Sequence, residues 1–377
     1  MDWVDELALV DQHCHSLVAG ELDADGFAAL LTEGPAPAPG ADPFDSMLGL
    51  AVRRECAPLL DLPVHAPGAD YLARRAELGG AEVAERMLRA TGGAALLVDH
   101  GFQGENLLGL DELGRVAAAP VSEVLRLESV AEQVAARVVT GSLTVRDYPE
   151  ALAAELAARA GQVVATKSIL AYRYGFDVEP VRPSDAEVAV AADRWLGRGG
   201  EGAARLTDPV LLRHALWCGV ALGLPVQLHT GFGDPDEDLH RANPVLLTAF
   251  CRATQHTGTP IVLLHCYPYH REAAWLAQVF PHVHLDVGLA ATYVGFRAVD
   301  LLAEVLELAP FGKLLYSSDA FGLPELYLVA ARAFRRSVRV ALGGWASSGE
   351  AAEPDVRRVA AMIAADNARR LYPNARV

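Results

Sequence analysis

Short apolar segments alternate with longer segments of helical spacing along most of the chain. The short segments are rich in Val, Leu and Ile, and each is followed by a turn and by apolar residues three to four positions apart. Parallel strands joined by helices produce this alternation, because each parallel connection needs a crossover. Eight such units predict an α/β protein with a closed (β/α)8 TIM barrel. The expected strands span residues 8–13, 94–99, 121–127, 162–167, 225–229, 260–265, 283–287 and 313–317.

Two connecting segments carry clear helix signals. Residues 148–160 are rich in Ala and Leu, which favour helices. Asp208 and Pro209 precede residues 210–222 as an N-cap and a first-turn proline, and Gly223 ends that segment. These signals support the strand and helix repeat.

Residues 33–80 break this repeat. They begin with a stretch rich in Pro and Gly and continue with helical patterns. A connection of this length between two barrel strands is often functional. We therefore predict one barrel domain over residues 1–377, with residues 33–80 as a helical insertion that caps the barrel mouth after the first strand.

The composition permits a large enzyme and argues against several partners. The chain has 377 residues, of which 52% are hydrophobic, and its formal net charge of -16 comes from acidic residues mixed with basic ones. This charge argues against nucleic acid or an anionic membrane surface as a partner. No apolar run reaches the roughly 18 residues of a membrane span, and the first residues resemble no signal peptide, which predicts a cytoplasmic protein. The five cysteines include no Cys-x-x-Cys pair, so we expect reduced, buried thiols.

Two histidines one residue apart end the first expected strand. Because side chains alternate faces along a strand, His13 and His15 point the same way and can share one divalent metal ion. The carboxyl ends of all barrel strands lie at one face. Four further polar residues stand at or near the ends of later expected strands: Lys167, His229, His265 and Asp319. The sequence therefore predicts that these six side chains converge on one site.

A second His-x-His pair has a different position in the repeat. His282 and His284 stand before and at the start of the seventh expected strand, at the opposite face, where no metal role is expected. Asp286 follows them and is a candidate to orient a ligand histidine through its free ring N–H. The acidic residues 234–238 come soon after His229 and are expected at the rim of the site, either solvated or next to a substrate amino group.

Four motifs, taken in their order along the chain, resemble those of the amidohydrolase superfamily. They are residues 166–173 (TKSILAYR), 227–234 (QLHTGFGD), 261–265 (IVLLH) and 317–319 (SSD). They are most similar to the amidohydrolase 2 group, which includes the amidohydrolase-like region joined to glutamine synthetase in fungal and plant proteins. The resemblance covers about residues 5–375, and the motifs around Lys167 and His229 are its most specific part.

The resemblance implies a metal-dependent barrel hydrolase. It implies that His13, His15 and His229 bind a metal ion together with Asp319, and that His265 binds a second metal ion or contacts the substrate or the attacking water. Imidazoles with one carboxylate also suit Zn²⁺ best on chemical grounds, with Mn²⁺ or Fe²⁺ as alternatives. Asp319 is expected to take the proton of the attacking water and pass it to the leaving amine.

Lys167 has two alternative roles. In some relatives in the superfamily the lysine of the fourth strand is carbamylated and bridges two metal ions, which makes the site binuclear. As a free ammonium, Lys167 would instead bind a substrate carboxylate or an oxyanion. Arg173 is a candidate carboxylate clamp because of its fork geometry. Tyr172 and His100 are further candidates for contact with the substrate.

These interpretations predict an enzyme that hydrolyses a C–N bond of a small carboxylic-acid or amino-acid derivative. It would use one or two metal ions, and its catalytic residues would be Asp319, His265 and Lys167. Its partner would be a small molecule, and a homo-oligomer is compatible with the sequence. Related barrels decarboxylate, hydrate or isomerise small acids, so these reactions are alternatives. A non-catalytic barrel that binds a metal or a metabolite is a third reading, which the complete set of ligand candidates disfavours.

Overall fold

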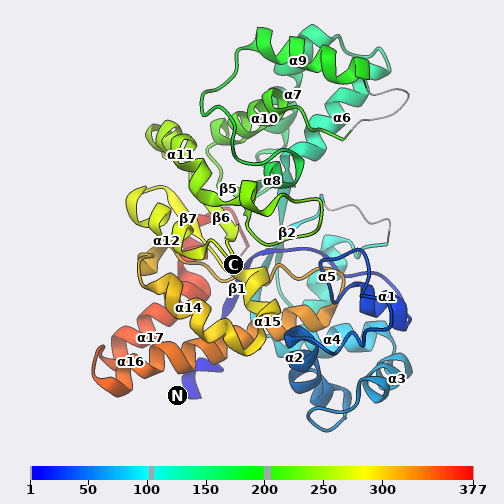
Figure 1. Cartoon of the computed structure of the whole chain (residues 1–377), viewed down its shortest axis with the longest axis vertical. Helices are drawn as coiled ribbons and strands as arrows, with labels where there is room; N and C mark the ends of the chain where they lie inside the picture. The colour runs from blue at the N-terminus through cyan, green and yellow to red at the C-terminus, as the bar shows by residue number, and fades with distance from the viewer. Residues whose placement is uncertain (1, 102–105, 199–204, 377) are drawn as a thin grey trace.

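A parallel sheet forms the centre of the protein (Figure 1). The computed structural model describes residues 2–101, 106–198 and 205–376. Within these residues the sheet has seven strands in chain order, and all neighbours are parallel. Because every connection is a crossover, all carboxyl ends lie at one edge of the sheet. The strands are β1 (Leu9–Cys14), β2 (Gly93–Asp99), β3 (Val121–Arg126), β4 (Ala165–Ser168), β5 (Val226–Thr230), β6 (Ile261–His265) and β7 (Val283–Leu285).

The eighth expected strand, residues 313–317, differs from the prediction. It makes only an isolated bridge to β7. The segment still lies between the two ends of the sheet, since the Leu315 amide donates to β7 at 3.0 Å and the Tyr316 carbonyl accepts from β1 at 3.2 Å. The backbone then leaves the extended conformation at Asp319, where φ is 50°. Irregular hydrogen bonds, in place of a regular ladder, thus join this segment to β7 and to β1.

Helices flank the sheet on its outer side (Figure 1). Those expected over residues 148–160 and 210–222 are confirmed as α7 and α10, and the Asp208 side chain accepts from the first amides of α10. The helices are α1 (Ala24–Ala29), α2 (Met47–Glu55), α3 (Gly68–Leu78), α4 (Gly80–Ala90), α5 (Leu110–Ala117), α6 (Leu127–Val139), α7 (Tyr148–Arg159), α8 (Leu170–Arg173), α9 (Asp185–Arg198), α10 (Pro209–Ala221), α11 (Thr248–Thr254), α12 (His270–Val279), α13 (Gly288–Tyr293), α14 (Ala298–Leu306), α15 (Pro324–Ser337), α16 (Gly343–Ser348), α17 (Glu353–Ala361) and α18 (Asn367–Leu371).

The strands are buried on both faces, which explains their continuous apolar runs. Every residue of β1, β5 and β6 is buried, as expected of parallel strands covered by helices. One apolar cluster contains residues from the strands β1, β2, β3, β4 and β6. It also contains Leu315 and, near the C-terminus, Ala368 and Tyr372. All five cysteines are buried and unpaired, as predicted. This apolar packing fixes the strands whose ends carry the polar side chains.

The connection between β1 and β2 contains the segment 33–80. It includes α2 and α3, and α2 packs against α15. From this segment, Glu33 and Gly34 line the cavity described below, whereas α2 and α3 contribute no lining residue. The cap function of the segment therefore stays a prediction. In the described part of the chain, none of the helices has the length and apolar character needed to cross a bilayer.

Candidate metal centre

The structure brings the six predicted strand-end side chains together. The closest contacts join His13 Nε2 to Asp319 Oδ1 at 3.1 Å and to Lys167 Nζ at 3.1 Å. The Nε2 atom of His15 lies 3.5 Å from Asp319 Oδ1, and that of His265 lies 3.6 Å from Asp319 Oδ2. The ring of His229 lies next to that of His265, with 4.6 Å between the two ring centroids. Four separate strands and the segment after β7 thus supply one continuous polar cluster.

Hydrogen bonds on the outer nitrogens orient the first two histidine rings. His13 Nδ1 lies 2.8 Å from Gln227 Oε1, and His15 Nδ1 lies 2.9 Å from the backbone carbonyl of Asp99. A carbonyl oxygen can only accept, so both Nδ1 atoms carry the proton. Each Nε2 therefore presents a lone pair toward Asp319, which is the tautomer that a metal ligand requires.

Gln227 is itself held in one orientation. Its Nε2 donates to the backbone carbonyl of Gln12 at 2.7 Å and to the Tyr372 hydroxyl at 3.0 Å. Because the amide nitrogen is committed to these acceptors, the amide oxygen is the atom that faces His13. The Tyr372 hydroxyl in turn donates to the Gln12 side chain. The C-terminal end of the chain thus fixes the orientation of the His13 ring.

Several buried polar atoms of the cluster have no hydrogen-bond partner among the described residues. They are both ring nitrogens of His265, Nε2 of His229, Oδ1 of Asp319 and Oε2 of Glu237. Leaving such groups unsatisfied costs roughly 1–3 kcal/mol each. Separately, two sets of potential ligand atoms are compact enough for one ion: His13 and His15 with Asp99, and His13 and His265 with Asp319. The unsatisfied atoms and the compact sets both fit a bound cation.

Burial sets the protonation states of the cluster. It lowers the pKa of His13 to about 4, with the neighbouring Lys167 acting in the same direction, and it lowers the pKa of His229 and His265 well below the usual range. It also lowers the pKa of Lys167 to about 8. Burial alone would raise the pKa of Asp319, but the neighbouring rings of His265, His13 and His15 together outweigh it and hold this pKa well below its usual range. Neutral imidazoles beside a carboxylate are the form that binds divalent metals.

Buried carboxylates hold the backbone beneath the site. Asp286 Oδ1 accepts from the backbone amide of His265 at 2.8 Å, at a residue whose φ is 66°. This corrects the prediction that Asp286 orients a ligand histidine through its ring N–H. Asp11 accepts from the backbone amide of Ser318 at 2.9 Å, next to Asp319. The two acids therefore stabilise the turns that present His265 and Asp319.

A cavity of about 460 Å³ opens beside the cluster. It is bordered by His15, Lys167, His229, His265 and Asp319, and its other polar walls carry both signs of charge. The cationic side chains are Arg126, Arg173 and Arg205, and the anionic ones are Glu33, Asp234 and Asp236. The cavity can thus take a small molecule that carries polar groups at both ends.

Two of the predicted substrate contacts lie in this cavity and one does not. Arg173 lines it, and its Nη1 atom pairs with Glu132 Oε1 at 3.2 Å, whereas its Nε atom is buried without a hydrogen bond among the described residues. Tyr172 lines it too, and its ring lies 4.2 Å from that of His229. His100 is exposed at the end of β2 and is absent from the lining.

Sequence reasoning missed two residues next to the ligand candidates. Gln227 stands two positions before His229 on β5, so strand alternation places both on one face and was the available signal. Glu237 belongs to the acidic residues 234–238, but its Oε2 lies 2.9 Å from His229 Nε2 and its side chain is only 2% exposed. Burial and the neighbouring Asp234 raise the pKa of Glu237 to about 8. Nothing in the run distinguishes Glu237 from its exposed neighbours.

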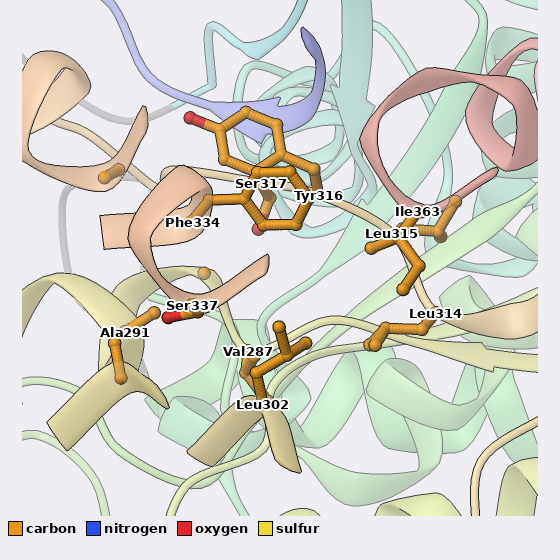
Figure 2. Close-up of a pocket in the computed structure, with 13 residues that line it drawn as sticks. Val287, Ala291, Leu302, Leu314, Leu315, Tyr316, Ser317, Phe334, Ser337 and Ile363 are labelled. Carbon is orange, nitrogen blue, oxygen red and sulfur yellow. The ribbon is translucent and has the colours of Figure 1, made fainter. Parts of the chain in front are cut away.

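A second cavity is not a candidate site. Figure 2 shows this cavity, of about 30 Å³, between α13, α14 and α15 and the segment 314–317. Its walls are mainly apolar, with side chains such as Val287, Leu302 and Phe334. The lining residues that carry a hydroxyl are Tyr316, Ser317 and Ser337. It is a packing defect beside the eighth segment, because it lacks the convergent polar groups of a binding site.

Known proteins resemble the chain over most of its length. The sequence profile of the family described as Amidohydrolase matches residues 10–373. Protein fluG of Emericella nidulans is 31% identical over 286 residues, which are 68% of this chain and 33% of that protein. The chain thus spans about a third of the length of this curated relative.

Solved structures resemble the fold. A protein from Lactobacillus casei ATCC 334, proposed to be a metal-dependent hydrolase, superposes with a TM-score of 0.86 at 29% identity and covers 99% of this chain and 97% of its own. A uronate isomerase from Bacillus halodurans C-125 superposes with a TM-score of 0.64 at 13% identity, over 99% and 94% of the two chains. The second likeness concerns the fold alone. Because the family profile matches residues 10–373, and the strand-end cluster agrees with it, the chain belongs to the amidohydrolase family.

Proposed function

We propose that this protein is a metal-dependent hydrolase that cleaves a C–N bond in a small carboxylic-acid or amino-acid derivative. The observation that supports the proposal is the convergence of His13, His15 and His265 on the Asp319 carboxylate, together with the buried atoms of His265 and Asp319 that have no hydrogen-bond partner among the described residues. Nitrogen and carboxylate donors of this kind suit Zn²⁺ best, with Mn²⁺ and Fe²⁺ as alternatives. His229 supplies a further imidazole at the edge of the set.

The protein side chains have distinct tasks in this reaction. A bound divalent cation polarises a carbonyl group and lowers the pKa of water to about 7. Asp319 is ionised and borders the cavity, so its carboxylate accepts the proton of the attacking water and returns it to the leaving nitrogen. The burial of His13 and His265 excludes bulk water from the donor atoms. Gln227 keeps the His13 lone pair aimed at the cation.

Arg173 supplies the main argument for an acidic substrate. Its Nε atom is buried beside the cavity without a hydrogen bond among the described residues, whereas Nη1 pairs with Glu132, and a substrate carboxylate would satisfy the Nε–H group. Tyr172 packs on the His229 ring and closes the wall between Arg173 and the cluster. A small acid held at Arg173 would direct its amide carbon toward Asp319.

Lys167 fits two roles in this proposal. Its Nζ atom lies 3.1 Å from His13 Nε2, so an ammonium there would stabilise an oxyanion next to the ligand atoms, and a carbamate there would add a ligand. Carbon-13 NMR of protein incubated with labelled bicarbonate separates the two roles. A carbamate carbonyl resonance that disappears in Lys167→Arg supports carbamylation, and its absence supports the ammonium.

The proposal is tested by metal analysis and product analysis of the same preparation. Protein purified without chelator should contain a divalent metal that His13→Ala loses. Assays against a panel of N-acyl and amide derivatives of small acids should release an amine or ammonia. Evolution of CO₂ or formation of an isomeric product would replace the hydrolase by a decarboxylase or isomerase on the same site. A metal-free protein without any turnover would contradict the proposal.

A further inference from the structure

Glu33 is a carboxylate in the cavity wall that the proposed reaction leaves without a task. It lies between α1 and α2 and borders the cavity together with Asp234 from the loop after β5. Among the described residues neither carboxylate forms an ion pair, whereas their neighbour Asp236 pairs with Arg205. Burial raises the pKa of Glu33 to about 7, and Asp319 and Asp234 act in the same direction. A cationic group bound in the cavity would relieve this unfavourable arrangement.

A second polar group in the same wall also lacks a partner. Thr292 on α13 lines the cavity, and its side chain belongs to a residue that is only 2% exposed. Its Oγ1 atom is buried and has no hydrogen-bond partner among the described residues. A helical threonine commonly donates to the carbonyl four positions back, and Thr292 does not. Its hydroxyl is therefore left to bond with a molecule in the cavity.

Tyr293 connects these groups. It follows Thr292 on α13, lines the cavity, and is hydrogen-bonded to the Glu33 carboxyl group. Burial raises the pKa of Tyr293 above its usual range, and Glu33 acts in the same direction, so the hydroxyl keeps its proton and donates. The ring of Phe232, two positions before Asp234, packs edge-on against Tyr293 at 5.3 Å. The connections after β1, β5 and β7 thus meet in one acidic wall.

This acidic wall and Arg173 lie toward different parts of the donor cluster. Arg173 follows Tyr172, whose ring lies 4.2 Å from that of His229 at one edge of the cluster. Glu33 lies toward Asp319, which after burial has the largest effect on the Glu33 pKa. A molecule that contacts both Arg173 and Glu33 would therefore extend across the cluster. Its carboxylate would lie at Arg173, its amide beside Asp319 and a cationic group at Glu33.

A metal ion is a weaker explanation for Glu33. The compact donor sets found among the described residues contain neither Glu33 nor Thr292. A hydroxyl is also a poor ligand for Zn²⁺ compared with the imidazoles and thiolates it prefers. An ammonium group has three N–H donors, which a carboxylate, a hydroxyl and a second carboxylate can accept. The chemistry of this wall therefore favours an ammonium group that belongs to the substrate.

We propose that Glu33, with Thr292 and Asp234, binds a protonated amino group of the substrate. The inference rests on the proposed function of the same site and narrows its substrate class. The substrate is an amide with a free carboxylate on one side of the scissile bond and a free ammonium group on the other, as in a dipeptide. Arg173 and Glu33 then hold the two ends, and the amide lies beside Asp319.

The test uses a dipeptide analogue that cannot be hydrolysed. In the phosphinic analogue of alanylalanine, a P(O)(OH)–CH₂ unit replaces the amide and both charged ends remain. A second compound carries hydrogen in place of the amino group, and a third carries hydrogen in place of the carboxylate. Isothermal titration into zinc-loaded protein measures the three dissociation constants. Wild type should bind the parent compound at least about tenfold more tightly than either truncated compound.

Variants assign each end to its wall. Glu33→Gln removes the charge and keeps the shape, so it should lose the preference for the amino group and keep that for the carboxylate, and Arg173→Met should do the reverse. Thr292→Val should weaken binding of the parent compound about threefold, and Thr292→Ser, which keeps a hydroxyl, should recover it. Asp45→Asn changes an exposed acid of the same segment, outside the cavity lining, and should bind all three compounds like wild type.

Three results would overturn the inference. They are equal affinity of wild type for the parent and the deamino compound, no binding of the parent compound to zinc-loaded wild type, and an unchanged preference for the amino group in Glu33→Gln that circular dichroism shows to be folded. The binding experiments need no turnover. Elemental analysis and product analysis of the same preparation show separately whether the proposed metal dependence or the proposed C–N hydrolysis fails.

Discussion

Two His-x-His pairs in this chain have the same spacing and different surroundings. His13 and His15 end β1, and a carboxylate oxygen of Asp319 lies within 3.5 Å of both Nε2 atoms. His282 and His284 stand before and within β7. There, the Nε2 atom of His282 contacts the Thr254 hydroxyl at 3.1 Å. Among the described residues, neither His282 nor His284 belongs to a compact donor set.

The difference shows that position in the sheet, and not the motif, produces the candidate centre. The carboxyl ends of parallel strands collect side chains from many segments, whereas the start of a strand does not. The His282 pair also lies near the cationic side chain of Lys313, which together with burial lowers the pKa of both histidines. Both pairs have a lysine nearby, but at the His13 pair the Asp319 carboxylate offsets the charge of Lys167, and that carboxylate attracts a cation.

The largest contrast is expected from alanine substitutions in the two pairs. His13→Ala removes one of about four ligands from a site whose binding free energy is roughly 10–16 kcal/mol for Zn²⁺, so affinity should fall about 100- to 1000-fold, and activity with it. His284→Ala should leave Zn²⁺ affinity within about twofold. Isothermal titration with Zn²⁺ measures both. Equal losses in the two variants would contradict the importance of position.

A second contrast concerns stability of the metal-free protein at low pH. The pKa of His13 is about 4 in the folded chain and about 6.5 when unfolded, so the unfolded state binds more protons between these values. The contribution of His13 to stability, complete above pH 6.5, should therefore fall by about 3 kcal/mol as the pH drops to 4, in addition to the contributions of His229 and His265. Urea unfolding at several pH values measures this slope. His13→Gln should reduce the slope by the His13 share, and an unchanged slope in that variant would contradict the assignment.

The orientation of the His13 ring offers a third test. Gln227→Leu removes the acceptor for Nδ1–H, and loss of such an outer partner typically weakens metal affinity about 10- to 100-fold. Gln227→Glu restores an acceptor and should recover much of the affinity. Competition with a chromophoric chelator reports both values. If Gln227→Leu binds Zn²⁺ like wild type, the hydrogen bond does not orient the ligand.

The smallest expected effect is on substrate binding. Arg173→Met removes the buried Nε–H group that faces no partner among the described residues, and a charged hydrogen bond is worth about 1.5–3 kcal/mol, so KM for an acidic amide should rise at least about tenfold with little change in kcat. Arg115→Met, at an exposed surface helix, should change neither value. Steady-state kinetics separates the two constants. A fall in kcat with unchanged KM would assign Arg173 to the chemical step instead.

The sequence predicted the parts of the fold that depend on local pattern. Buried Val and Leu runs followed by helical spacing identify β1 to β7, and the strand ends then predict that His13, Lys167 and His229 converge. The eighth strand was expected from the same kind of run. It is joined to its neighbours by irregular hydrogen bonds, and Asp11 and β1 hold the backbone at its end. Such tertiary contacts leave no periodic signal.

The residues around the ligands were harder to predict for the same reason. Gln227 shares a strand face with His229, so alternation contains the information. Glu237 is one acid in an acidic run, and only the folded loop separates it from Asp236. His100 ends β2 as expected, yet it is exposed, because a strand end alone does not determine whether the next side chain turns inward.

Anomalous X-ray diffraction at the zinc edge, from crystals grown with Zn²⁺, tests the central claim most directly. We predict a strong anomalous peak at about 2.0–2.2 Å from Nε2 of His13 and His15 and from a carboxylate oxygen of Asp319. A peak at His282 and His284, or no peak near Asp319 in protein that binds Zn²⁺ in solution, would contradict it.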